Sequence, residues 1–378
     1  MLSISRLRNH IAGFIILFYL ISPLDNIWNF PIISSVLVSL LFLIILSLGT
    51  TELIRVLALN TIFISLTLLA TYEISFYALK SSFALSFFFA LLNKDFNLDA
   101  FLIFNYVKFT CIALFSLMLV PLFSNFNLIL NALNQLNISY FFSKSIDLYE
   151  VNSVLKYQWI FETPTDAQSI FTGITLFIPF FIWIILSLYL KRDRSLTLFI
   201  SFLPFVILYS RSALLFLLLY FAAKKKEFRT IVLLGTVIFI TYFTVSSYQE
   251  LDQLLRGRDL IIAQMASEDI PFFGSGPGFW QLDLESQTGQ GSVHNIFLEF
   301  LHAYGIFGTF LASILISLCY YKNKSSSLLL GLTYFISFGL FSFNLADIGF
   351  LGSCALLTKL SLTDKEFTNS KAYNAQQL

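Results

Sequence analysis

Residues 294–321 read HNIFLEFLHAYGIFGTFLASILISLCYY, and this stretch decides the fold class of the chain. After its polar start it is almost entirely apolar, and as a helix it is long enough to cross the roughly 30 Å hydrocarbon core of a bilayer. The rest of the chain is similar, because 57% of its 378 residues are hydrophobic and only 12% are charged. Soluble domains carry about a quarter charged residues. The sequence therefore predicts an all-α, polytopic integral membrane protein.

Working outward from this stretch, the apolar runs predict about twelve transmembrane helices. They cover residues 10–25, 31–49, 53–72, 74–93, 99–123, 168–190, 195–210, 212–223, 230–247, 294–321, 326–343 and 346–360. We expect residues 1–363 to form a single transmembrane domain with two long loops, at about 124–167 and 248–293. A polar tail at 364–378 completes the chain.

Basic residues indicate the orientation in the membrane. The clusters at 191–194, 224–229 and 322–324 share one side with Arg6 and Arg8 in the twelve-span arrangement. Lys and Arg accumulate on the cytoplasmic side of membrane proteins. We therefore expect both termini to be cytoplasmic and both long loops to lie outside.

Composition also excludes several classes of partner. The net charge is only +1, so there is no global positive field to indicate binding of nucleic acid. Cys111, Cys319 and Cys354 lie in apolar runs without a CxxC motif, which argues against a disulfide framework or a zinc site. No cluster of Asp and His demands a metal.

Three arginines are candidates for contact with an anionic group on the outer side. Arg211 lies between two apolar segments, where a guanidinium needs a partner or water, and its planar fork suits a phosphate or a carboxylate. Arg256 and Arg258 stand on either side of one glycine and together can bind a diphosphate. The alternatives are snorkelling of Arg211 and ion pairs of all three with nearby aspartates or lipid headgroups.

The segment GSGPGFW at 274–280 predicts a turn, since Gly274, Gly276 and Gly278 surround a proline. Backbone N–H groups in such a turn can face an anion, and a turn without any ligand is the alternative. The segment is not a P-loop, because no GK[ST] follows it.

His294 and Asn295 stand where the second long loop meets the span 294–321. Histidine can transfer protons near neutral pH, and a helix N-terminus favours anions. At about 100° per residue, Asn295, Glu299 and His302 share one polar stripe, and such residues usually face a bundle interior or a cavity. The alternative is a packed polar cluster in which Glu299 pairs with His302.

Lys80 and Lys108 lie inside expected spans, and their role is open. Contact with a lipid phosphate is one interpretation. The other is an ion pair with Glu52, Glu73 or Glu299. Asp347, near the outer end of the last expected span, is undecided in the same way.

Taken in order, these elements resemble the superfamily of O-antigen ligases and Wzy-type O-antigen polymerases. The matching segments are SRSALL at 210–215, GR at 257–258, the turn at 271–279 and the His-Asn block at 294–308. By motif the resemblance covers about 195–320, and the N-terminal half carries no matching motif.

The resemblance implies a glycosyltransferase with a GT-C-like fold that acts on the outer face of the bacterial inner membrane. Its donor would be an undecaprenyl-diphosphate-linked oligosaccharide, and it would need neither a metal nor a cofactor. A polymerase joins such repeats into O-antigen or capsule, whereas a ligase transfers the polymer to lipid A-core. We favour the polymerase, because that branch varies widely in sequence. Membrane lipid, a chain-length regulator and a flippase are the expected partners.

Under this interpretation Arg211 and Arg258 stabilise the charge that develops on the diphosphate leaving group, and Arg256 assists in binding it. His294 orients or deprotonates the acceptor hydroxyl, or contacts the diphosphate. The remaining expected substrate-binding residues are Asn295, Glu299, Gly276 and Gly278. Alternative bases or sugar-binding groups are Asp259, Glu268, Asp269, Asp283 and Glu285.

A flippase or another secondary transporter is the main alternative class, since it would also combine many spans with buried Lys and Glu. Transporters commonly carry internal repeats and helices broken at matched positions, and no such symmetry is visible in the sequence. A structural or signalling protein would leave Arg211, Arg258 and His294 unexplained.

Overall fold

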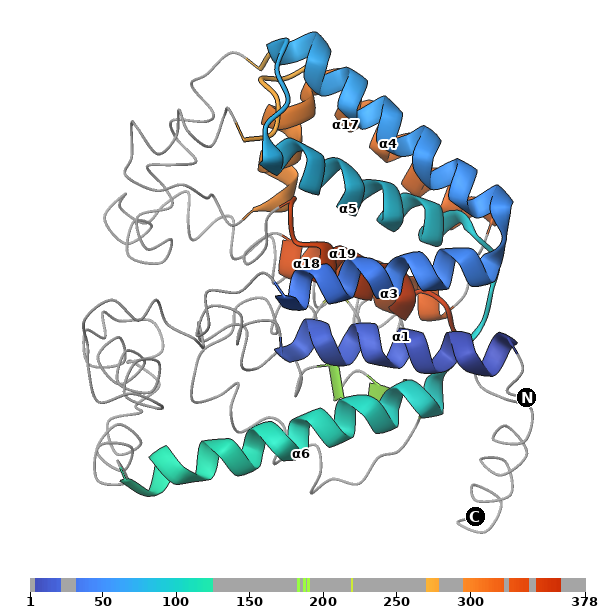
Figure 1. Ribbon diagram of the computed structural model, residues 1–378, viewed down its shortest axis with the longest axis vertical. Helices are drawn as coiled ribbons and strands as arrows, with labels where there is room; N and C mark the ends of the chain where they lie inside the picture. Colours follow the sequence, from blue (N-terminus) through green and yellow to red (C-terminus); the bar gives the residue numbers. More distant parts are fainter. Residues whose placement is uncertain are drawn as a thin grey trace. The chain divides into compact units, whose positions relative to one another are not determined.

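The computed structural model describes residues 4–21, 32–124, 182–183, 186–187, 189–190, 219, 270–278, 295–322, 326–339 and 345–361. These residues are mostly helical (Figure 1), as expected for an all-α protein. Three helices among them are long and apolar enough to cross a membrane, namely Thr50–Thr71, Phe76–Asn93 and Ile296–Tyr321. The count of twelve spans and the side on which the termini lie stay predictions.

The described helices coincide with expected apolar runs. The first five are α1 (Ile4–Ile21), α3 (Ile32–Leu48), α4 (Thr50–Thr71), α5 (Phe76–Asn93) and α6 (Ala100–Ser124). The last three are α17 (Ile296–Lys322), α18 (Ser326–Gly339) and α19 (Ile348–Leu357). α1 begins before its apolar run because Arg6 and Arg8, which a hydropathy count leaves out, are good helix formers. The expected spans between 168 and 247 lie outside the described residues, apart from isolated positions.

The described elements belong to two compact units, and we describe each by itself. Unit 1 contains α1, α3, α6 and two short strands, β1 (Leu98–Asp99) and β2 (Leu360–Ser361). Unit 2 contains α4, α5, the turn 270–278, α17, α18 and α19. The single domain expected for 1–363 stays a prediction.

Unit 1 is built on the packing of α1 against α6. The close contact is made possible by Gly13, where a Cβ atom would overlap the ring of Tyr106. β1 and β2 form a parallel ladder in which Leu98 pairs with Leu360. Lys108, on α6, is exposed and has no ion-pair partner among the described residues.

α5 is the central helix of unit 2, because it packs against α4, α17 and α19 (Figure 1). Its side chains are nearly all buried from Ser81 to Leu92. The buried hydroxyl of Ser86 donates to the Ser82 carbonyl oxygen at 2.6 Å. Small hydroxyl side chains that satisfy themselves in this way let neighbouring helices approach closely.

Unit 2 has two ends, which we name after a residue at each. At the Glu52 end, α4 begins and α5 ends, and the Leu92 carbonyl oxygen accepts from Lys359 Nζ at 2.8 Å and from Cys319 Sγ at 3.1 Å. At the Tyr77 end, α5, α17 and α19 begin. In the expected orientation the Glu52 end is cytoplasmic and the Tyr77 end faces outward.

A buried carboxylate holds the Glu52 end together. Glu52 is only 1% exposed. One of its oxygens accepts from Lys94 Nζ at 2.8 Å and the other from Arg55 at 2.9 Å. Both cations are partly exposed, so they reach the carboxylate from the solvated side of the helices.

Replacing either Lys94 or Arg55 by methionine is expected to lower the free energy of unfolding by about 1 kcal/mol, because one cation still neutralises Glu52. The double variant is expected to lose about 3–5 kcal/mol, since it leaves a buried carboxylate without a charge partner. Thermal unfolding in detergent measures both. Adding Glu52→Gln to the double variant should restore most of the loss, and strictly additive losses would contradict a shared network.

Candidate functional site

The structure describes only some residues of the predicted site, and these residues all lie in unit 2. The described members are Asn295, Glu299, Gly276 and Gly278. The members outside the described residues are Arg211, Arg256, Arg258 and His294. The outer-loop carboxylates named as alternative bases also lie outside them.

α17 consists of two helical segments, 296–304 and 306–322, that meet at Gly305. The backbone of Gly305 has φ 67° and ψ −167°, far from helical values. Almost only glycine populates this region. The helix therefore changes direction at Gly305, and backbone groups on both sides of it lose their helical partners.

The turn 270–278 supplies the missing partners. In an unbroken helix the Phe307 N–H would donate to the Ala303 carbonyl oxygen. Here the Ala303 oxygen accepts from the Gly276 N–H at 3.0 Å, and the Phe307 N–H donates to the Phe272 oxygen at 3.1 Å. A third bond runs from the Ser275 N–H to the His302 oxygen at 2.8 Å. The turn thus satisfies backbone groups that the break in α17 leaves without helical partners.

The predicted turn is confirmed, and its glycines are explained by close contacts. Gly274, Gly276 and Gly278 all have positive φ, of 81°, 79° and 93°. A Cβ atom at Gly274 would overlap the backbone of α17, and one at Gly276 would overlap the side chain of Thr71. The Gly276 N–H donates to the Ala303 carbonyl oxygen of α17, as a turn without a ligand would allow. Substrate binding by Gly276 and Gly278 stays a prediction.

The turn is also fixed to the start of α5. The Ser75 hydroxyl donates to the Pro277 carbonyl oxygen at 3.0 Å and accepts from the Ala78 N–H at 3.0 Å. Ser75 is therefore the N-cap of α5 and at the same time the attachment point of the turn. A Cβ atom at Gly278 would overlap the Ser75 hydroxyl, so the glycine permits this attachment.

Asn295 acts as the N-cap of α17, one turn before Glu299. Its side-chain oxygen accepts from the N–H groups of Phe297 and Leu298, both at 3.1 Å. These bonds satisfy two of the free N–H groups at the helix start. The side chain is half-buried, and its amide NH₂ group can donate to a substrate. Its role in substrate binding stays a prediction.

Glu299 links three elements of unit 2. Its side chain is 1% exposed, and its oxygens accept from the Tyr77 hydroxyl at 2.8 Å and from the Leu345 N–H at 2.6 Å. His302, one turn later, is 2% exposed. Both side chains face the interior, which favours the packed polar cluster over direct contact with a substrate. Nothing in the sequence singles out Tyr77 as the partner, because a tyrosine at a span boundary is common.

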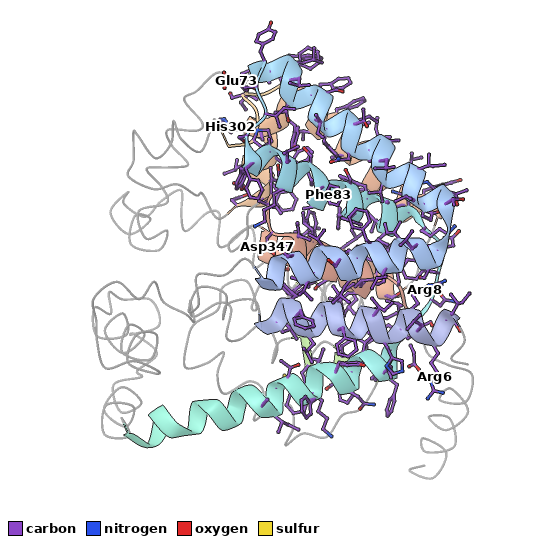
Figure 2. The ribbon with its side chains drawn as sticks, viewed as in Figure 1. Arg6, Arg8, Glu73, Phe83, His302 and Asp347 are labelled. Carbon is purple, nitrogen blue, oxygen red and sulfur yellow. The ribbon has the colours of Figure 1, made fainter. Side chains whose placement is uncertain are left out.

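Lys80 and Asp347 also lie toward the Tyr77 end, near the starts of α5 and α19. Asp347 caps α19 by accepting from the Phe350 N–H at 2.8 Å. Both residues are half-buried. Asp347 is therefore the N-cap of α19, and the role of Lys80 stays open. Figure 2 labels His302 and Asp347 at this same end of unit 2.

The Tyr77 end thus offers two kinds of polar group. Glu299 and His302 are enclosed and brace the helices. Lys80, Asn295 and Asp347 are half-buried, and Lys80 and Asn295 carry hydrogen-bond donors. Among the described residues, no group of three or more His, Cys, Asp and Glu could hold a metal ion.

Glu299→Ala is expected to lower the free energy of unfolding by about 2–4 kcal/mol, because it leaves the Tyr77 hydroxyl and the Leu345 N–H buried without an acceptor. Glu299→Gln retains an acceptor and a donor and is expected to stay within about 1 kcal/mol of the wild type. Thermal unfolding in detergent measures both. If the glutamine variant unfolds as easily as the alanine variant, the negative charge itself holds the helices together.

No family model, curated protein or solved structure matches this chain. Its function is therefore inferred from the chemistry and the placement of its own residues.

Proposed function

We propose that this protein is a glycosyltransferase that joins undecaprenyl-diphosphate-linked oligosaccharide repeats into surface polysaccharide, at the outer face of the bacterial inner membrane. The observation that carries the proposal is the junction at Gly305. The family resemblance rests partly on the segments 271–279 and 294–308, and their described parts, 271–278 and 295–308, meet there through three main-chain hydrogen bonds. The glycines of the turn and Gly305 of α17 therefore belong to one structural element, and not to two unrelated turns.

The chemistry assigned to the site is displacement at an anomeric carbon. The acceptor hydroxyl oxygen bonds to that carbon, the bond to the diphosphate oxygen breaks, and undecaprenyl diphosphate leaves with the electron pair. Arg211 and Arg258 stabilise the charge on this leaving group, and Arg256 helps to bind it. His294 orients the acceptor hydroxyl or takes its proton. In the sequence it directly precedes Asn295, the N-cap of α17, and a helix start of this kind favours anionic groups.

A lipid-linked glycan flippase is the second candidate, and the broken helix favours it. Transporters commonly build their sites from discontinuous helices, and α17 is discontinuous at Gly305. Ionisable residues within a membrane domain, such as Glu299 and Lys80, also mark substrate or ion pathways. The polymerase remains the first choice, because the flippase leaves the arginine pair and His294 without a role.

Deleting the gene in its host and resolving the surface glycan on a gel tests the proposal. For a polymerase, single repeats still reach lipid A-core while the ladder of longer chains disappears. Polymer that accumulates on the undecaprenyl carrier, with none on the core, would instead identify a ligase. Lipid-linked repeats retained in the cytoplasmic leaflet would identify a flippase.

A further inference from the structure

Three phenylalanine rings form an exposed cluster where the turn meets α17. We call Phe272, Phe273 and Phe307 the aromatic patch. Their ring centroids lie 4.9 to 5.8 Å apart, so the rings pack on one another. Their side chains are nevertheless 57%, 37% and 39% exposed. Contiguous exposed apolar surface of this kind indicates a binding partner.

The aromatic patch continues an apolar face of α17. Beyond the break, Ile306, Phe310, Ile314 and Leu318 are exposed by 53%, 64%, 39% and 57%. Their spacing of four residues places them along one side of the helix. α17 is one of the helices long and apolar enough to cross a membrane. An uncharged face along such a helix fits lipid acyl chains, and the aromatic patch lies at its Tyr77 end.

The backbone of the turn is suited to an apolar environment. Irregular backbone is tolerated at membrane depth only where its polar groups are satisfied by protein or by enclosed water. The N–H groups of Gly274, Ser275 and Gly276 all donate to carbonyl oxygens, at 3.1, 2.8 and 3.0 Å. The Gly274 bond lies within the turn, whereas those of Ser275 and Gly276 go to the His302 and Ala303 oxygens of α17. Together with the bond from the Phe307 N–H to the Phe272 oxygen, they hold the turn beside α17, inside the span expected at 294–321.

We propose that the turn 270–278 is seated in the bilayer, and that the aromatic patch binds the acyl chains of membrane lipids. The sequence places this segment in an aqueous outer loop, so the proposal changes its environment. It is independent of the proposed glycosyl transfer. Its consequence is that the second long loop is fixed to the membrane at a point in its interior as well as at its two ends.

Site-directed spin labelling tests this. A nitroxide is attached at Phe273→Cys, and the protein is reconstituted in vesicles of phosphatidylethanolamine and phosphatidylglycerol. Collision with oxygen, which concentrates in lipid, is compared with collision with a water-soluble nickel chelate. Ile314→Cys on α17 is the matched lipid-facing control, and Glu73→Cys in the exposed α4–α5 connection is the matched aqueous control. The native cysteines are buried, so unsubstituted protein measures background labelling.

The expected result is an oxygen-to-nickel ratio at 273 close to that at 314 and several-fold above that at 73. A ratio equal to that at 73 would overturn the proposal and return the turn to water. Strong spin–spin broadening between labels would also overturn it, because a second copy of the chain would then cover the patch. Phe272→Cys, at the most exposed ring, repeats the measurement if the first variant folds poorly.

Discussion

Cells that carry only Arg258→Ala or only His294→Ala are expected to make no surface polymer while the protein stays at normal abundance in the membrane. Removing one group that stabilises transition-state charge costs about 100- to 1000-fold in rate, and loss of a general base costs about as much or more. Either loss would remove the ladder of long chains from a glycan gel of the complemented deletion strain. An immunoblot of the membrane fraction measures abundance in the same cells.

Two further variants sharpen this experiment. Arg211→Lys is expected to be damaging as well, because an ammonium group cannot reproduce the two parallel hydrogen bonds of a guanidinium. Lys108→Ala removes an exposed cation of α6 in unit 1 and is expected to leave the ladder unchanged. A normal ladder from Arg258→Ala or from His294→Ala would remove that residue from the site.

Gly305→Ala is expected to destabilise unit 2 by about 2–5 kcal/mol, combining backbone strain with overpacking. Gly305 adopts φ 67°, which an alanine rarely tolerates, and its new Cβ would overlap the Gly274 nitrogen and the Phe272 and Pro271 oxygens. Relief requires either expulsion of the turn or straightening of α17. Thermal unfolding in detergent measures the loss, and faster proteolysis near the turn would show that it has been expelled.

Gly49→Ala is the matched control for this variant. Gly49 also has a positive φ, of 111°, but among the described residues nothing lies within 4 Å of the position that an alanine Cβ would take. The loss of stability in Gly49→Ala, expected to be about 1–3 kcal/mol, therefore reports backbone strain without steric overlap. Equal losses from both variants would mean that the contact between the turn and α17 contributes little.

The helices of this protein could be predicted well from the sequence, because long apolar runs are a local signal. The run expected at 53–72 is α4 at Thr50–Thr71, and the run at 74–93 is α5 at Phe76–Asn93. The break in α17 could not be predicted in this way. A lone glycine in a helical pattern is usually tolerated, and the groups that satisfy this break come from a separate segment.

The candidate site was predictable only in part, for a similar reason. Helical periodicity correctly predicts that Glu299 and His302 turn to the interior. The capping role of Asn295 was missed, although an asparagine directly before an apolar run is a recognisable N-cap signal. Tyr77 pairs with Glu299 through tertiary packing, and one sequence carries no signal for a contact between such distant residues.

The central position of α5 has a consequence for the biosynthesis of the protein. The Tyr77 hydroxyl bonds to a carboxylate 222 positions further along the chain, and the Leu92 oxygen accepts from a lysine 267 positions further along. At roughly 5–20 residues per second, ribosomes need about 10 to 50 s to make these partners. Throughout that interval α5, with its buried serines, can pack only against helices made before it, such as α4, and against the insertion machinery. Release of α17 and α19 into the membrane is therefore the step that completes unit 2.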